Sequence, residues 1–364
     1  MRRVFRPARF RIEARQSECN ALPLKILILK PSSLGDVVQA LPVLRLIKQR
    51  HPASEIYWWL NSNLMPLLEE DPDLTSVISF DRDRWATPRH WKKLWQLIRQ
   101  MRAQSFDWVI DLQGLARSGS LAWLANGKFT VGLDEPREGA RGFYDIIVTR
   151  PTFYTHAVDW YLGVLPFLEV PVHWNFDWLP ERPNIAAVVQ QKWKPGKERW
   201  LIIQPGARWL NKRWPVEYFA ELVRQLAAYY PELRFAVMGG QEDQPLGAMI
   251  TRAAPTRCLD LTGRVTLPEM VEWIRLSVLM VTNDTGPMHV AVALGKPVVP
   301  IFGPTEPRRT GPYHQIDRAV QLSLPCAPCL KPACAYEKPL ECLRGISPAM
   351  VIAHVKGRLA SLAN

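Results

Sequence analysis

The order of apolar segments constrains the fold of this chain more than any other feature. Short apolar runs alternate with longer amphipathic runs, and this pattern occurs twice, before and after a stretch rich in Pro and Trp at residues 170–200. The runs expected to form strands are residues 25–29, 55–60, 77–80, 108–112, 200–204, 234–238, 258–261, 279–283 and 298–302. Strands that alternate with helices form parallel, doubly wound sheets. We therefore predict an α/β chain with two Rossmann-like domains facing a central cleft.

The same pattern predicts the limits of each segment. We expect a basic, flexible N-terminal arm at residues 1–22, a first Rossmann-like domain at 23–175 and a linker at 176–199. A second Rossmann-like domain follows at 200–346, and a C-terminal helix at 347–364. Ser347 can cap this last helix, and Pro348 fits its first turn.

The charge of the chain indicates anionic partners. Its formal net charge is +12, which attracts nucleic acid, anionic lipid or a phosphorylated substrate. No nucleic-acid-binding motif is present, so we expect no nucleic acid partner. No apolar run approaches the roughly 20 residues that span a bilayer, and the start does not resemble a secretory signal. We infer a cytoplasmic protein whose Arg-rich arm either lies on an anionic membrane surface or is a disordered tail.

Residues 281–312 contain two neighbouring strand-to-helix junctions. Asp284, Thr285, Gly286 and His289 follow the first strand, a small-residue helix is expected to open at Val290, and residues 303–305 follow the second strand. Each junction offers unpaired backbone N–H groups and a positive helix end, which suit a phosphate. Asp284 would repel a phosphate and suits a sugar hydroxyl. Together these groups indicate a nucleotide-sugar site.

Two other strands in the second half end in polar residues. Arg208 and Lys212 follow the strand at 200–204 and are well placed for a diphosphate. Glu242 follows the strand at 234–238 and could accept hydrogen bonds from a ribose diol, as an acidic residue does in dinucleotide-binding folds. The alternative for the basic residues is a solvated surface loop.

Asp36 follows the first strand of the chain and faces the expected cleft. A carboxylate there could remove a proton from an acceptor hydroxyl. Alternatively, Asp36 caps the helix that begins beside it, and local sequence alone favours this second role.

Four of the six cysteines are clustered. Cys326, Cys329, Cys334 and Cys342 have the spacing C-x2-C-x4-C-x7-C, and four thiolates could hold a structural zinc ion or an iron–sulfur cluster. The alternative is a Pro-rich loop with reduced thiols.

One acidic motif suggests a catalytic metal but does not fit the rest of the chain. Asp81-Arg82-Asp83 resembles the D-x-D of a glycosyltransferase architecture with one domain, whereas this chain repeats its pattern, and the neighbouring arginines oppose cation binding. We expect Arg82, Arg84 and Arg117 to meet an acidic acceptor instead.

Taken together, these residues resemble glycosyltransferase family 9, the bacterial lipopolysaccharide heptosyltransferases. The motifs are KPSSLGDVVQALPVL, DLQGLARS, QPGARWLNKRWP, GGQED and NDTGPMH followed by FGPTEP, and they occur in order between residue 25 and about residue 345. The resemblance implies a GT-B fold, an acceptor on the N-terminal domain and an ADP-sugar on the C-terminal domain. It also implies that no metal or other cofactor is required.

The resemblance assigns roles to individual residues. Asp36 matches the catalytic base, which reverses the local preference for a cap. Lys212 matches the diphosphate-binding lysine, Glu242 the ribose contact and Asp284 the donor-sugar contact. The expected donor-side residues are Arg208, Lys212, Glu242, Asp284, Thr285, Gly286 and His289. The expected acceptor-side residues are Ser33, Gly35, Arg82, Arg84, Gln113, Arg117, Arg137 and His156.

The function so implied is inverting, metal-independent transfer of heptose from ADP-heptose to the lipid A–Kdo core at the cytoplasmic surface of the inner membrane. One alternative is a transferase of the same fold with another nucleotide-sugar donor or glycan acceptor. Another is a non-catalytic protein that binds a nucleotide or a glycolipid.

Overall fold

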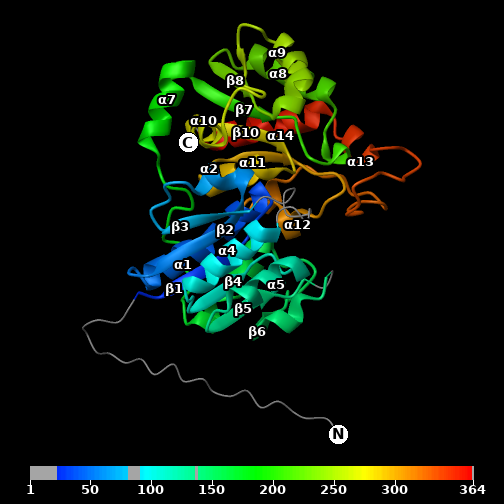
Figure 1. Cartoon of the computed structure of the whole chain (residues 1–364). Coiled ribbons are helices and arrows are strands. Elements are labelled where there is room, and N and C mark those ends of the chain that lie inside the picture. The colour runs from blue at the N-terminus through cyan, green and yellow to red at the C-terminus, as the bar shows by residue number, and fades with distance from the viewer. Residues whose placement is uncertain (1–22, 81–90, 136–137, 363–364) are drawn as a thin grey trace.

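The computed structural model describes residues 23–80, 91–135 and 138–362 and consists of two α/β units, one above the other in Figure 1. We call them the N-terminal unit, which contains the first sheet, and the C-terminal unit, which contains the second. The N-terminal arm lies outside the described residues, as do Asp81, Arg82, Asp83, Arg84 and Arg137.

The first sheet has six strands in the order β3-β2-β1-β4-β5-β6. Every pairing is parallel, as in a Rossmann fold. The strands are β1 (Lys25–Leu29), β2 (Glu55–Asn61), β3 (Ser76–Phe80), β4 (Trp108–Asp111), β5 (Phe129–Leu133) and β6 (Ile146–Val148).

The second sheet has five parallel strands in the order β11-β10-β7-β8-β9, which repeats the arrangement of the first sheet without its sixth strand. The strands are β7 (Arg199–Gln204), β8 (Leu233–Val237), β9 (Cys258–Asp260), β10 (Leu279–Asn283) and β11 (Val298–Ile301). Two parallel sheets confirm the predicted α/β class.

Buried strand residues alternate between two faces of each sheet. Ile26 and Ile28 of β1 belong to a core that also includes Ile202 of β7, so one apolar cluster joins the two units. Leu27 and Leu29 of β1 face a different core on the opposite side of the first sheet. Because both faces of the strands are covered, they are apolar without a polar alternation.

Helices connect the strands and bring the two units together. The helices are α1 (Leu34–Arg50), α2 (Met65–Leu68), α4 (Trp91–Ala103), α5 (Ala116–Ala125), α6 (Ala157–Leu162), α7 (Pro183–Trp193), α8 (Val216–Tyr229), α9 (Gln244–Arg252), α10 (Leu267–Leu276), α11 (Gly286–Ala293), α12 (Pro307–Thr310), α13 (Glu341–Arg344) and α14 (Pro348–Ser361). In the described residues, α1 of the N-terminal unit packs against α11 of the C-terminal unit, and α14 packs on α8. The Ser347 hydroxyl accepts a hydrogen bond from the Met350 N–H, which confirms the predicted cap.

Two helix predictions at the donor-side junctions were wrong. The helix expected to open at Val290 begins at Gly286, because Pro287 fits a first turn and Thr285 takes the N-cap position. The helix after β11, α12, is a single turn whose N-cap, Glu306, already accepts from the Arg308 N–H and pairs with its guanidinium. The second junction is therefore not an open anion site. Strands β5 and β6 were not predicted.

Candidate active site

A cavity of about 390 Å³ lies between the two units. One wall comes from the start of α1, with Ser33, Leu34, Gly35, Asp36 and Gln39. The opposite wall comes from the segments after β7 and β10, from the start of α11 and from the end of α12. Its residues are Arg208, Trp209, Lys212, Asp284, Thr285, Gly286, Pro287, His289 and Thr310. Asp36 and Asp284, some 250 positions apart in the chain, thus line the same cavity. Both walls follow the strands at which each sheet reverses its order, where ligands bind in open α/β sheets.

The two walls meet at a glycine. A Cβ atom on Gly35 would lie 2.5 Å from Cδ2 of His289, so no other residue fits at position 35 without moving this ring. A Cβ on Gly286 would in turn lie 3.0 Å from Leu34. The structure therefore gives Gly35 and Gly286 a packing role that the sequence did not reveal.

Asp36 is both a helix cap and a cavity residue. Its Oδ2 accepts hydrogen bonds from the Ser33 N–H at 2.9 Å and the Ser33 hydroxyl at 2.6 Å. Burial raises the pKa of this carboxyl, but the Lys30 ammonium and the Ser33 hydrogen bonds outweigh burial, so the pKa of Asp36 lies below its usual value. The carboxylate is ionised at neutral pH, and the two roles weighed from the sequence do not exclude each other.

Two residues that the sequence did not single out support Asp36. The Tyr161 hydroxyl, on α6, donates to Asp36 Oδ1 at 3.3 Å. Lys30 is buried at the end of β1, where its ammonium donates to the Leu112 carbonyl at 2.8 Å and lies 4.6 Å from the centre of the Tyr161 ring. Lys30 was visible as a basic residue directly after a buried strand, whereas nothing local marked Tyr161.

Lys212 and Asp284 form an ion pair on the opposite wall. Lys212 Nζ lies 2.6 Å from Asp284 Oδ2, and the Thr305 hydroxyl donates to the same oxygen at 2.7 Å. The side chain of Asp284 is 7% exposed and that of Lys212 is 19% exposed, so this charge-assisted pair is largely removed from water. The sequence had placed both residues at the donor but had not predicted that they contact each other.

The remaining donor-side residues differ in their surroundings. Arg208 is exposed at the cavity. His289 is buried, and burial lowers its pKa more than the nearby Asp284 and Asp36 carboxylates raise it, so the ring is neutral at pH 7. Glu242 is exposed beyond β8 and does not line the cavity. Its neighbour Asp243 is buried and accepts from the Gly240 N–H at 3.1 Å.

The expected acceptor-side residues are only partly brought together. Ser33 lines the cavity, but Gln113 and Arg117 follow β4 and do not line it. His156 is buried: its Nδ1 accepts from the Val158 N–H, and its Nε2 lies 3.0 Å from the Gly311 carbonyl oxygen. Both ring nitrogens are thus engaged within the protein, and the contact of His156 with the acceptor stays a prediction. The His156 ring links the two units.

A second cavity of about 590 Å³ adjoins the first and shares Lys212 and Thr310 with it. Its lining includes Arg150 and Arg309, one from each unit, and the exposed ring of Phe153. The Arg309 guanidinium lies 4.4 Å from the centre of that ring. Arg150 follows β6, and its place at a cavity was not predicted because that strand was not predicted.

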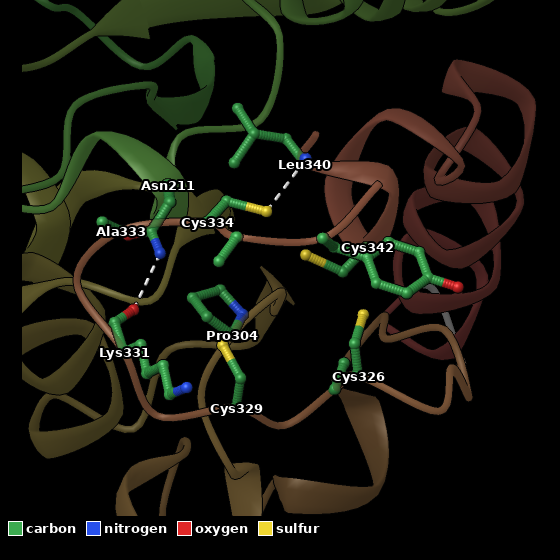
Figure 2. A pocket seen from close by; sticks show the side chains of 12 residues that line it. Asn211, Pro304, Cys326, Cys329, Lys331, Ala333, Cys334, Leu340 and Cys342 are labelled. Atoms are coloured by element: carbon green, nitrogen blue, oxygen red, sulfur yellow. Dashed lines mark hydrogen bonds between the residues drawn. The ribbon is translucent and has the colours of Figure 1, made fainter. Parts of the chain in front are cut away.

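The four clustered cysteines line a separate cavity of about 260 Å³ (Figure 2). In the parts of the chain that the structure describes, no three His, Cys, Asp or Glu side chains lie close enough together to hold an ion as they stand.

None of the helices in the described ranges is sufficiently long and apolar to cross a bilayer.

Two facing Rossmann-like units with a cavity between them have the architecture of the GT-B fold, and comparisons with solved structures agree. The E. coli ADP-heptose LPS heptosyltransferase II superposes with a TM-score of 0.75 at 23% identity, over 94% of this chain and 100% of that one. The E. coli heptosyltransferase WaaC with ADP-2-deoxy-2-fluoro heptose gives a TM-score of 0.71 at 20% identity, over 92% and 99%. These likenesses confirm the GT-B fold.

Sequence comparisons identify the family. Residues 94–340 match the model of glycosyltransferase family 9 (heptosyltransferase). Lipopolysaccharide heptosyltransferase 1 of Pseudomonas aeruginosa is 30% identical over 332 residues, which covers 86% of this chain and 88% of that protein. This chain belongs to glycosyltransferase family 9, and it is a glycosyltransferase.

Proposed function

We propose that this enzyme transfers a heptose from ADP-heptose to a hydroxyl of the lipopolysaccharide inner core, with inversion at the anomeric carbon and without a catalytic metal. Its relative in Pseudomonas aeruginosa is a lipopolysaccharide heptosyltransferase, and WaaC was solved with an ADP-heptose analogue. The observation that carries the proposal is the shared cavity, with Asp36 on one wall and Lys212 and Asp284 on the other.

Asp36 is the proposed base. Oδ2 accepts two short hydrogen bonds from Ser33, whereas the Tyr161 hydroxyl lies 3.3 Å from Oδ1, so Oδ1 is the less strongly held oxygen. The acceptor hydroxyl gives its proton to Oδ1 as its oxygen attacks the anomeric carbon from the side opposite ADP. The C–O bond to the diphosphate breaks in the same step, and ADP leaves with the electron pair.

The opposite wall stabilises the departing diphosphate. Lys212 and Arg208 supply positive charge, and α11 presents its positive N-terminal end to the same cavity. When the diphosphate arrives, Lys212 exchanges its bond to Asp284 for one to phosphate oxygen. Asp284 Oδ2 is then available to a donor-sugar hydroxyl. We assign the ribose to Glu242, since it stands at the carboxyl end of β8 beside this wall.

The acceptor occupies the second cavity in this proposal. Arg150 and Arg309 can meet the negative groups of a Kdo-type core there, and Phe153 offers an apolar face. An acceptor of this kind is anchored in a membrane, so we place the enzyme at the cytoplasmic surface of the inner membrane, where its +12 charge favours anionic lipid.

Incubation of the purified enzyme with a Kdo–lipid A acceptor and a panel of ADP- and UDP-sugars tests the proposal by release of the nucleotide. We expect ADP-heptose to be the preferred donor, turnover to persist in EDTA, and NMR of the product to show an inverted anomeric centre. A preference for a hexose donor would contradict heptose as the donor sugar. Loss of turnover in EDTA would contradict metal independence, and a retained anomer would contradict inversion.

A further inference from the structure

The cysteine-lined cavity has no role in the proposed reaction, and it shares no lining residue with the cavity of Asp36 and Lys212. Cys326, Cys329 and Cys334 lie on an irregular segment, and Cys342 lies on α13. Figure 2 shows the four cysteine side chains around one space, with Pro304 between Cys329 and Cys334 and with Asn211 on the side of Lys331. Residues 16 positions apart in the chain therefore converge here by folding.

The surroundings of these sulfur atoms suit metal-bound thiolates. The Leu340 N–H donates to Cys334 Sγ at 3.4 Å, and hydrogen bonds of this kind support thiolate ligands in metal sites. Cys342 Sγ is packed against Gly303, where an added Cβ would lie 3.1 Å from it. Cys342 is thus fixed on the body of the C-terminal unit, while Cys334 lies on the exposed segment.

We propose that Cys326, Cys329, Cys334 and Cys342 bind one zinc-class divalent ion as a closed structural site. Each thiol loses a proton to solvent, four metal–sulfur bonds form, and no group is oxidised or reduced. The ion draws the sulfur atoms to about 2.3 Å from itself, which is the usual Zn–S distance. The irregular segment that carries Cys326, Cys329 and Cys334 permits this closure around the fixed Cys342.

The proposed metal site also stabilises the donor wall, which is the wall of the active-site cavity that holds Lys212 and Asp284. The Asn211 amide donates to the Lys331 carbonyl at 2.8 Å, and Lys212 is the next residue after Asn211. The Leu330 N–H donates to the Pro304 carbonyl at 2.7 Å, and the next residue, Thr305, holds Asp284. The bound ion therefore stabilises the segment that contacts Asn211, next to Lys212, and Pro304, next to Thr305. This consequence rests on the proposed function, whereas the metal site itself does not.

Elemental analysis and cobalt substitution of the full-length protein test the site. We expect about one zinc-class ion per chain, and the visible absorption of tetrahedral thiolate coordination with Co²⁺. Cys334→Ser, chosen because Cys334 is exposed, should lower metal affinity at least about tenfold. Cys258→Ser is the matched control, since Cys258 lies on β9 outside the cluster, and it should bind as the wild type does.

Three results would overturn the site: no ion bound after reconstitution with Zn²⁺ or Co²⁺, disulfides among the four cysteines, or unchanged affinity in Cys334→Ser. The proposed effect on the donor wall has its own test in the affinity for ADP, which should be lower in Cys334→Ser than in the wild type and in Cys258→Ser. An unchanged ADP affinity in Cys334→Ser would show that the metal site does not stabilise the donor wall. Because metal content is measured without any sugar donor, failure of the heptosyltransferase proposal would leave the metal result standing.

Discussion

Gly35 of α1 lies directly against the imidazole ring of His289 of α11, and this contact joins the wall that holds Asp36 to the wall that holds Lys212 and Asp284. The residue after Gly35 is the proposed base, and His289 lies on the first turn of the helix that points at the proposed diphosphate. This close approach, together with that of Gly286 to Leu34, limits the distance between the two halves of the site.

Gly35→Ala should destabilise the protein. The new Cβ would lie 2.5 Å from His289 Cδ2, and overpacking of this kind costs about 1–3 kcal/mol. Thermal unfolding measures the change. Gly357→Ala is the matched control, because it also lies in a helix and its Cβ meets nothing within 4 Å. That control should be neutral or slightly stabilising. Equal melting temperatures for the two variants would show that the contact is not tight.

Tyr161→Phe tests the support of the base. Loss of the hydroxyl removes the hydrogen bond to Asp36 Oδ1, which favours the carboxylate, so the pKa of Asp36 should rise. We expect the acid limb of the kcat/KM profile to move to higher pH. We also expect kcat to fall by about tenfold, which corresponds to the free energy of one such hydrogen bond. Tyr57→Phe, in β2, is the control. A lower kcat with an unmoved acid limb would indicate a merely structural role.

The sequence predicted the class of fold because its main signal, buried apolar strands between amphipathic helices, is local. Strands β1 and β10 were found within a residue of their observed limits. β5 and β6 were missed for a physical reason: β6 has only three residues, and β5 contains Gly132, whose missing side chain makes room for the Tyr144 ring. Such a glycine weakens the apolar pattern and becomes intelligible only when its neighbour is known.

The position of a residue at the cavity was predictable where the end of its own strand places it there, as for Asp36 and Asp284. It was not predictable where two distant residues meet. The contact of Tyr161 with Asp36 and the pairing of Lys212 with Asp284 depend on how the elements pack. The contact of the His156 ring with the Gly311 carbonyl, across the two units, was not predictable for the same reason.

Lys212→Met should weaken nucleotide binding. The substitution keeps much of the side chain's length but removes the charge that faces Asp284 and the proposed diphosphate. We expect the Kd for ADP to rise by about 10- to 100-fold, because a charged hydrogen bond in a partly buried site contributes about 1.5–3 kcal/mol. Lys128→Met, which removes an exposed lysine from the N-terminal unit, controls for net charge. An ADP Kd within twofold of the wild-type value would remove Lys212 from the donor site.

His156 should make stability depend on pH. Burial lowers the pKa of this imidazole to about 4, whereas in the unfolded chain it is near 6.5. Between these two pH values the unfolded chain binds a proton that the folded chain does not. The free energy of unfolding therefore decreases as the pH falls from 6.5 towards 4, by up to about 3 kcal/mol. Urea unfolding of His156→Asn should show a flatter dependence than the wild type, and the exposed His354→Asn should show none of this flattening. Parallel curves for wild type and His156→Asn would contradict the assignment.

The most direct test of the proposed mechanism is single-turnover transfer by Asp36→Asn, measured together with the affinity of the variant for ADP-heptose. The amide keeps the size of the carboxylate and the acceptor for the Ser33 hydrogen bonds but cannot remove a proton. We expect the transfer rate to fall by about 10²- to 10⁴-fold, the usual contribution of a general base, while donor affinity stays unchanged. Asp317→Asn, at an exposed carboxylate, should behave as the wild type. Transfer by Asp36→Asn at a near-normal rate would contradict the assignment of the base and, with it, the mechanism.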